Sequence, residues 1–320
     1  MKSKSFLTDF YYKSLYPILE DLEKDRKQLR YRIIVIGIIY TLIFALILIP
    51  LYSSIQDEDV LIFGAFGYIA LGGIIYKFLI KDYTSEFKEK IISPLIDALD
   101  ENLSYHKDLH ISEHLFSRSK LFSNPDRHSG NDLVKGEIKN TKIRFSDFHA
   151  EKRHRNSKGR DSWSTIFKGL FVVAEFNKNF IGQTVVLPDT AQNTFGDLIG
   201  HWLQSKNIGR DELVKMDDTE FEKKFVVYSD DQIEARYILS HSIMKKLSTF
   251  EKKFGHPLYI SFVRNHIHLA IYYDKDMFEP SIFRSLFEYK TAMEYVDTLH
   301  LVTGIIEELK LNQRIWSKSE

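Results

Sequence analysis

Two stretches without a charged side chain, close to the N-terminus, limit what this chain can fold into. Residues 33–52 (IIVIGIIYTLIFALILIPLY) form the first, and the second begins at Val60 (VLIFGAFGYIALGGIIY) and extends past one lysine to Ile80. A helix needs about 20 apolar residues to cross the hydrocarbon core of a bilayer, within a range of about 17–25. The segment between them, SSIQDED, allows only a tight connection. The sequence therefore predicts a transmembrane hairpin over residues 33–80, with spans at 33–52 and 60–80.

Basic residues flank this hairpin on one side only, and they predict its orientation. Those before the first span and after the second are Lys24, Arg26, Lys27, Arg30, Arg32, Lys77, Lys81, Lys88 and Lys90. The connecting loop carries Asp57, Glu58 and Asp59 and no basic residue. Lysine and arginine are enriched in cytoplasmic loops, so both termini are expected in the cytoplasm. The charged leader ahead of the first span is not the pattern of a cleaved signal peptide.

Composition excludes several classes of function for the rest of the chain. The 44 Lys and Arg balance 44 Asp and Glu, so no overall field attracts nucleic acid or acidic lipid. The chain has no cysteine, which excludes disulfides, cysteine–zinc sites and thiol catalysis. It also lacks a phosphate-binding glycine loop, a GxSxG elbow and an HExxH pair. We therefore predict no cofactor.

Hydrophobic periodicity predicts an α+β fold around the hairpin. Residues 1–32 are expected to form a cytoplasmic amphipathic helix, and residues 83–320 a cytoplasmic α+β domain. From Leu133 the apolar period changes from helical to two, and hairpin-like strand pairs predict a mostly antiparallel sheet. A helix is expected at 195–207, and a long C-terminal helix at about 288–311.

Histidines supply the candidates for a metal site. His106, His110 and His114 recur every four residues, which on a helix would stack three imidazoles on one face. His266 and His268 flank Ile267 in a predicted strand, so their rings face one side of the sheet. Solvated histidines and a polar outer sheet face are the commoner explanations of these patterns. The sequence therefore favours no metal, with these five residues as the candidates.

A basic segment, EKRHRNSKGRDS, suggests contact with anionic lipid. Its basic residues are Lys152, Arg153, Arg155, Lys158 and Arg160. Each basic residue near an anionic surface contributes about 1 kcal/mol to binding. A solvated hairpin loop is the simpler interpretation. Nucleic acid is not expected as a partner, because no aromatic residue stands between these basic residues to stack on bases.

The segment from Ser229 to Arg236 is the best candidate for catalysis. Asp230, Asp231, Glu234 and Arg236 are close enough in sequence to bind a cation or perform acid–base chemistry. The same pattern is typical of a strand that leads into a capped helix, where carboxylates accept hydrogen bonds from free amides. The capping interpretation is favoured.

Three segments carry a resemblance to a known family. FKGLFVVAEFNKNFIGQTVVLPD, EFEKKFVVYSDDQIEARYIL and LKLNQRIW are similar to a bacterial family of two-span membrane proteins catalogued as domain of unknown function 3137. The order of N-terminal helix, two spans and cytoplasmic α+β domain also matches. The resemblance implies a multi-pass protein of the bacterial inner (cytoplasmic) membrane. It implies no activity, cofactor or catalytic residue.

Together these features predict a membrane-anchored cytoplasmic domain that binds or scaffolds a protein partner at the inner membrane. The alternatives are an enzyme that uses the Ser229–Arg236 cluster on a membrane-proximal substrate, and a domain that senses anionic lipid. The two stretches 33–52 and 60–76 contain no charged side chain, which argues against conduction. Small residues in the second span (Gly64, Ala65, Gly67, Ala70, Gly72 and Gly73) favour close helix packing, either against Gly37 of the first span or in a homo-oligomer.

Overall fold

The computed structural model describes six ranges of the chain and divides them into two compact units. The described ranges are 2–138, 141–155, 159–175, 179–189, 213–273 and 276–311. The helical unit comprises residues 2–98 and 278–296, and the sheet unit comprises residues 99–277 and 297–320. The helix expected at 195–207 and the closing NQRIW motif lie outside the described residues.

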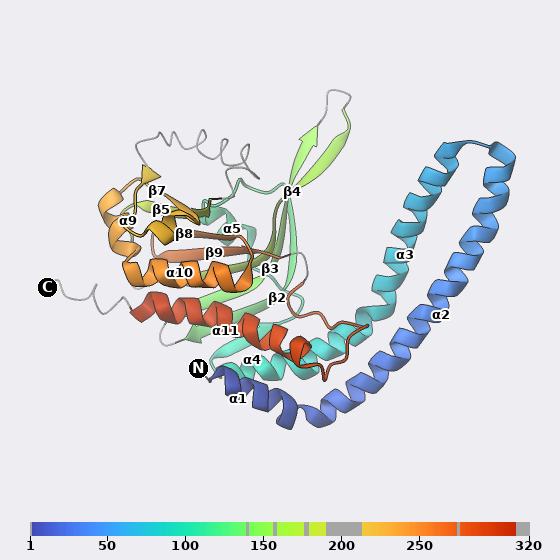
Figure 1. Cartoon of the computed structure of the whole chain (residues 1–320), viewed down its shortest axis with the longest axis horizontal. Helices are drawn as coiled ribbons and strands as arrows, with labels where there is room; N and C mark the ends of the chain where they lie inside the picture. Colours follow the sequence, from blue (N-terminus) through green and yellow to red (C-terminus); the bar gives the residue numbers. More distant parts are fainter. Residues whose placement is uncertain are drawn as a thin grey trace. The chain divides into compact units, whose positions relative to one another are not determined.

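Two long helices joined by a tight turn dominate the helical unit (Figure 1). Helix α2 spans Tyr16–Ile55 and α3 spans Glu58–Phe87. Gln56 ends α2 in the left-handed conformation, and the Asp57 side chain caps α3 by accepting from the amide of Asp59. Both helices are long and apolar enough to cross a membrane, and the most apolar part of each is unburied. The predicted pair of long apolar helices is confirmed.

Aromatic and small side chains pack the two helices together. The Tyr40 hydroxyl donates to the carbonyl of Tyr68 at 2.8 Å, and the two rings stack with centroids 4.8 Å apart. A Cβ added to Gly64 would lie 2.7 Å from the end of the Leu48 side chain, which would have to shift to admit it, so the glycine favours this close approach. A Cβ on Gly37, in contrast, would meet nothing within 4 Å. The expected contact through Gly37 was wrong, because the helices meet closely at Gly64 instead.

Short helical segments surround the base of the hairpin. They are α1 (Lys4–Asp9), the π-helical segments η1 (Phe10–Ser14) and η2 (Lys88–Ile92), and α4 (Ser93–Leu99). The expected amphipathic helix over residues 1–32 is therefore split between α1, η1 and the start of α2. Helix α11 (Tyr289–Leu311) begins in the helical unit and continues into the sheet unit, close to the range expected from the sequence.

A buried ion pair on α2 holds the segment that precedes α11. Glu23 and Arg26 lie 2.7 Å apart and are 5% and 3% exposed. The Arg26 guanidinium also donates to the carbonyl of Ile282 at 2.5 Å, and the amide of Leu286 donates to Glu23 at 3.1 Å. The Tyr11 hydroxyl donates to the Leu286 carbonyl at 2.8 Å. The ion pair therefore satisfies main-chain groups that would otherwise be buried without partners.

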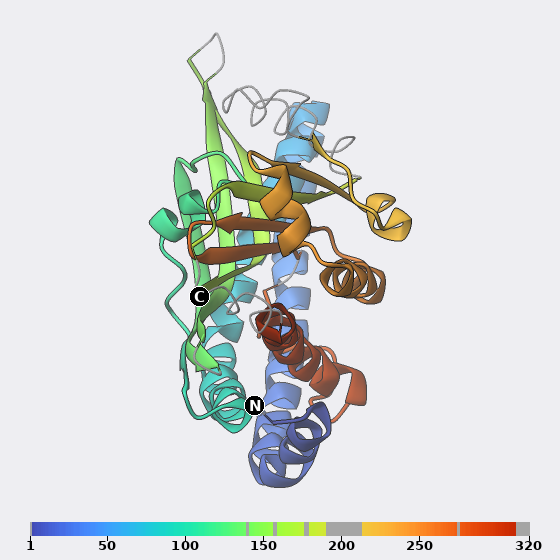
Figure 2. The ribbon, with the colours of Figure 1, turned by 90° about the vertical axis from the view of Figure 1, so that its left-hand side faces the viewer.

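The sheet unit contains a nine-stranded sheet within the described residues, ordered β1-β2-β3-β4-β9-β8-β5-β7-β6 (Figures 1 and 2). The strands are β1 (Leu103–His106), β2 (Arg127–Ile138), β3 (Thr141–Arg155), β4 (Asp161–Glu175), β5 (Gln183–Pro188), β6 (Leu213–Val214), β7 (Phe225–Ser229), β8 (Leu258–Val263) and β9 (His266–Tyr272). Each pairing between them is antiparallel. The predicted α+β class with a mostly antiparallel sheet is confirmed.

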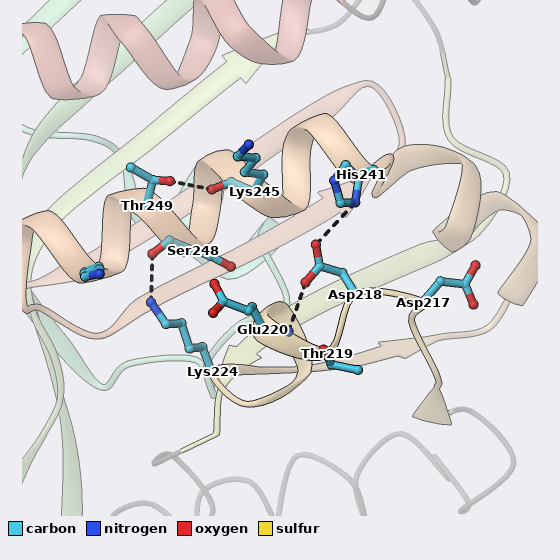
Figure 3. Close-up of a pocket in the computed structure, with 10 residues that line it drawn as sticks. Asp217, Asp218, Thr219, Glu220, Lys224, His241, Lys245, Ser248 and Thr249 are labelled. Atoms are coloured by element: carbon cyan, nitrogen blue, oxygen red, sulfur yellow. Dashed lines mark hydrogen bonds and ion pairs between the residues drawn. The ribbon is translucent and has the colours of Figure 1, made fainter.

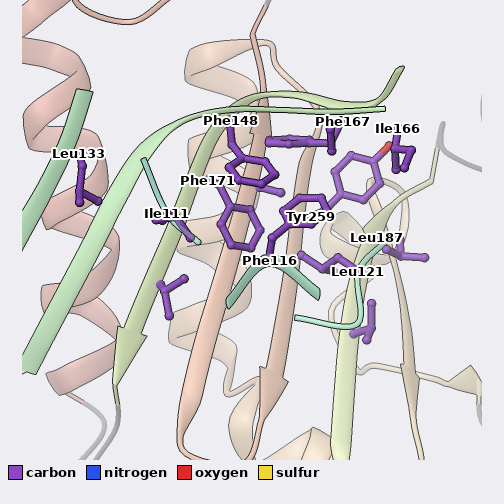
Figure 4. Packing of buried hydrophobic residues seen from close by; sticks show 14 residues of the cluster. Ile111, Phe116, Leu121, Leu133, Phe148, Ile166, Phe167, Phe171, Leu187 and Tyr259 are labelled. Carbon is purple, nitrogen blue, oxygen red and sulfur yellow. The ribbon is translucent and has the colours of Figure 1, made fainter. Parts of the chain in front are cut away.

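Helices cover both faces of this sheet. Helix α5 (Glu113–Arg118) lies on one face and α10 (His241–Phe254) on the other (Figure 2), while α8 (Thr219–Glu222) and α9 (Gln232–Ile238) flank β7 in sequence. Under α5, the Phe116 ring stacks on Phe148 with centroids 4.6 Å apart (Figure 4). Because both faces are covered, the strands carry long apolar runs rather than a strict alternation.

Candidate functional site

The carboxylates of the Ser229–Arg236 cluster accept hydrogen bonds from main-chain amides. Asp231 caps α9 by accepting from the amides of Ile233 and Glu234, each at 2.9 Å. Asp230 accepts from the amide of Gln183 at 2.5 Å. Glu234 accepts from the amides of Ile181, at 3.0 Å, and Gly182, at 2.8 Å. The cluster joins the start of β5 to the junction between β7 and α9.

These hydrogen bonds clamp the β5 segment to the junction between β7 and α9, and the geometry of this clamp favours a structural role. A Cβ on Gly182 would overlap the carboxylate of Asp230, so glycine is required where the two segments meet. Arg236 reaches the carbonyl of Lys215 at 3.4 Å and the Gln232 side chain at 3.5 Å. Carboxylates that already accept from fixed amides are poorly placed to move protons. The arrangement agrees with the capping interpretation.

Removing the Glu234 carboxylate should loosen the clamp. We expect Glu234→Ala to cost about 1–3 kcal/mol, because it leaves two amides of the β5 segment without their acceptor. Hydrogen exchange measured on peptides that contain Ile181 and Gly182 should speed up in this variant. Asp217→Ala is the control, since Asp217 is exposed. Equal exchange in both variants would contradict the proposed clamp.

The histidines at four-residue spacing do not share a helix. His106 ends β1, His110 lies in the following loop, and His114 belongs to α5. The expected helical stack was wrong because the pairing of β1 with β2 takes the first of these residues into the sheet. The His110 ring instead packs against Phe148, with centroids 5.6 Å apart. Among the described residues, no group of three or more His, Asp and Glu side chains could hold a metal.

His266 and His268 lie side by side on β9, with ring centroids 5.9 Å apart. His268 is 1% exposed, and burial, reinforced by His266 and Arg118, lowers its pKa to about 3. Burial also lowers the pKa of His266. His268 Nδ1 lies 3.3 Å from the Ser261 hydroxyl. His268 is therefore a neutral core residue, and the expected polar outer face was wrong here because α5 covers it.

Ion pairs neutralise part of the basic segment at the β3–β4 hairpin. Lys152 lies 3.3 Å from Asp126, and Arg153 lies 2.7 Å from Asp161. Arg155 and Arg160 are exposed. Lys158 lies outside the described residues. The positive charge available to an anionic lipid surface is therefore smaller than the sequence suggests.

A groove between α8 and α10 is a polar site that sequence reasoning missed (Figure 3). Its volume is about 610 Å³. One wall consists of residues at the start of α8 and just after it: Asp217, Asp218, Thr219, Glu220 and Lys224. The other wall consists of one face of α10: His241, Lys245, Ser248, Thr249 and Lys252. The spacing of the α10 residues by three or four indicates in the sequence that they share one face of a helix. That this face lies across the groove from α8 depends on the tertiary fold.

Two polar contacts between side chains shape this groove. His241 Nδ1 lies 3.3 Å from Asp218, which also caps α8 through the amides of Glu220 and Phe221. Lys224 Nζ lies 3.0 Å from Glu251 and donates to the carbonyl of Ser248 at 2.9 Å. These contacts join the wall built around α8 to α10 (Figure 3). The groove is therefore held by side chains from both walls.

Comparisons with known proteins bear on the family and the fold. The chain is similar in structure to the mycobacterial trehalose monomycolate transport factor A, TtfA, with 11% identity and a TM-score of 0.31 over 62% of this chain and 88% of that chain. A likeness of this degree carries no argument about function. No curated protein matches the sequence. The model of a family described as a protein of unknown function, DUF3137, matches residues 165–311. This match is to the family that the sequence resemblance predicted, and it extends over residues 165–311 of the chain.

Proposed function

We propose that the α2–α3 hairpin anchors this protein in a membrane and that the sheet unit binds or scaffolds a protein partner. The observation that carries the proposal is the apolar surface of the hairpin. Leu46, Phe63 and Phe66 are 75%, 71% and 69% exposed, and many of their apolar neighbours are exposed as well. Water-soluble proteins rarely expose continuous apolar surface of this extent. A bilayer would cover it.

The proposed location is the bacterial inner membrane, with both termini and the sheet unit in the cytoplasm. The acidic turn at residues 57–59 and the basic residues at the other end of the hairpin support this orientation. Membrane lipid is then one partner, through both spans. A second copy of the chain is the other proposed partner within the membrane, since a Cβ on Gly67 or Gly73 would meet nothing within 4 Å.

Single cysteines test the anchoring and the orientation directly, because the chain has no cysteine of its own. In spheroplasts, a membrane-impermeant maleimide should label Glu58→Cys in the turn of the hairpin. It should label Arg155→Cys in the sheet unit only after the membrane is permeabilised. The reverse pattern would contradict the orientation. Recovery of both variants in the soluble fraction would contradict the anchoring.

A binding role for the sheet unit is favoured over an enzyme acting through Asp230 and Asp231. Both carboxylates accept from main-chain amides, and neither lines the groove between α8 and α10. Lipid sensing by the β3–β4 segment is less favoured, because Lys152 and Arg153 are already paired with carboxylates. Photo-crosslinking in intact membranes from an exposed position such as Arg155 should capture a defined protein partner. Labelling of lipid alone would argue against the binding role.

A further inference from the structure

The unpaired charged side chains that line the groove differ in sign between its α8 wall and its α10 wall. Asp217 and Glu220 stand on the α8 wall (Figure 3), while Lys245 and Lys252 stand on the α10 wall. None of these four side chains has an ion pair or hydrogen bond within the described residues, in contrast to Asp218 and Lys224 on the same walls. Two carboxylates on one wall of the groove and two ammonium groups on the other are therefore unpaired within the part of the chain that the structure describes.

Ser248 adds a second, independent indication of a ligand. It lines the groove and is 8% exposed. Its hydroxyl oxygen is buried and has no hydrogen-bond partner within the described part of the chain. Buried hydroxyls are nearly always satisfied, by protein, water or ligand. A polar ligand in the groove would supply this partner.

We propose that the groove binds a short zwitterionic peptide. The ammonium group of the ligand meets Asp217 and Glu220, its carboxylate meets Lys245 and Lys252, and a peptide group reaches the Ser248 hydroxyl. The groove carries acidic as well as basic side chains. This disfavours a simple anion such as phosphate, because the α8 carboxylates would repel it. A volume of about 610 Å³ suits a peptide of a few residues, because pockets of about 300–1,000 Å³ hold ligands of that size. The groove lies wholly within the sheet unit, so the proposal is independent of the hairpin and its orientation.

Triglycine and its blocked forms test this with the full-length protein in lipid nanodiscs, by isothermal titration calorimetry. Unblocked triglycine should bind saturably. N-acetylation or C-amidation should each weaken binding by about tenfold or more, since each removes a charge-assisted contact. Added salt should weaken binding further, because the groove is open to solvent.

Variants that remove one charge from the groove show which wall binds each end of the peptide. Glu220→Gln should weaken triglycine but leave the already weak acetylated form unchanged, since that form has no ammonium group to lose. Lys252→Gln should weaken triglycine but leave the amidated form unchanged. Lys246→Gln is the control, because it makes the same change on α10 outside the groove.

Three results would overturn the proposal. One is the absence of binding at millimolar triglycine while circular dichroism shows a folded protein. Another is an effect of Lys246→Gln equal to that of Lys252→Gln, which would indicate overall charge rather than a site. The third is binding of inorganic phosphate that becomes stronger in Glu220→Gln and that triglycine does not displace. This result would define an anion site.

Discussion

Replacing Arg26 with glutamine should destabilise the helical unit by about 3–5 kcal/mol, the cost of leaving one member of a buried ion pair without its partner. Glu23 would remain buried and charged, and the carbonyl of Ile282 would lose its donor. Thermal unfolding of the full-length protein in detergent should shift to lower temperature. Hydrogen exchange in peptides around Ile282 and Leu286 should become faster.

Two controls separate the ion pair from general effects of charge. Lys27→Gln makes the same change at the next residue, which is exposed, and should have little effect. The double variant Glu23→Gln with Arg26→Gln should be less destabilised than Arg26→Gln alone, because no uncompensated charge remains. Equal stability of Arg26→Gln and Lys27→Gln would contradict the role of the pair.

Acid should weaken the same contact. Burial tends to raise the pKa of Glu23, but hydrogen bonds from Arg26 and the amide of Leu286 outweigh it, so the pKa is lowered overall. A carboxylate with a lowered pKa in the folded state stabilises the protein above the pKa of the unfolded state. That contribution is lost as the pH falls through the folded pKa. The difference between the parent protein and the double variant should therefore shrink in acid.

Phe116→Ala should cost the sheet unit about 3–5 kcal/mol, the range for removing a large aromatic side chain from a core. The ring is 1% exposed and stacks on Phe148, and its centroid lies 5.0 Å from that of Phe171 (Figure 4). Helix α5 has only six residues, so this one ring supplies much of its attachment to the sheet. Chemical denaturation should report the loss as a lower midpoint.

The matched control for this substitution is Ile233→Ala on α9, where the side chain is 82% exposed. Deleting an exposed side chain usually changes stability by less than about 0.5 kcal/mol. Hydrogen exchange of strand β9 should increase in Phe116→Ala and stay unchanged in Ile233→Ala, since α5 covers His268. A midpoint unchanged by Phe116→Ala would contradict the account of the core.

Local patterns were sufficient to predict the elements that are stable for local reasons. The pair of long apolar helices follows from two uncharged stretches, and the antiparallel strand pairs follow from the apolar period of two that begins at Leu133. The capping role of Asp231 was equally visible, because a cap acts within three residues of its own helix. The His106–His114 spacing misled because strand pairing overrides a helical period in so short a segment.

The sequence by itself determined the two apolar helices, the antiparallel α+β class and the likeness of residues 165–311 to the DUF3137 family. Hydrophobic periodicity and short motifs carry this information, because they act over neighbouring residues. Only the tertiary structure decided that Glu234 binds the amides of Ile181 and Gly182, and that Glu220 lines the same groove as Lys245 and Lys252 of α10. These contacts join residues that are far apart in the chain or that belong to separate elements. Local sequence patterns do not determine them, because which polar groups meet depends on how the sheet and its helices bring distant segments together.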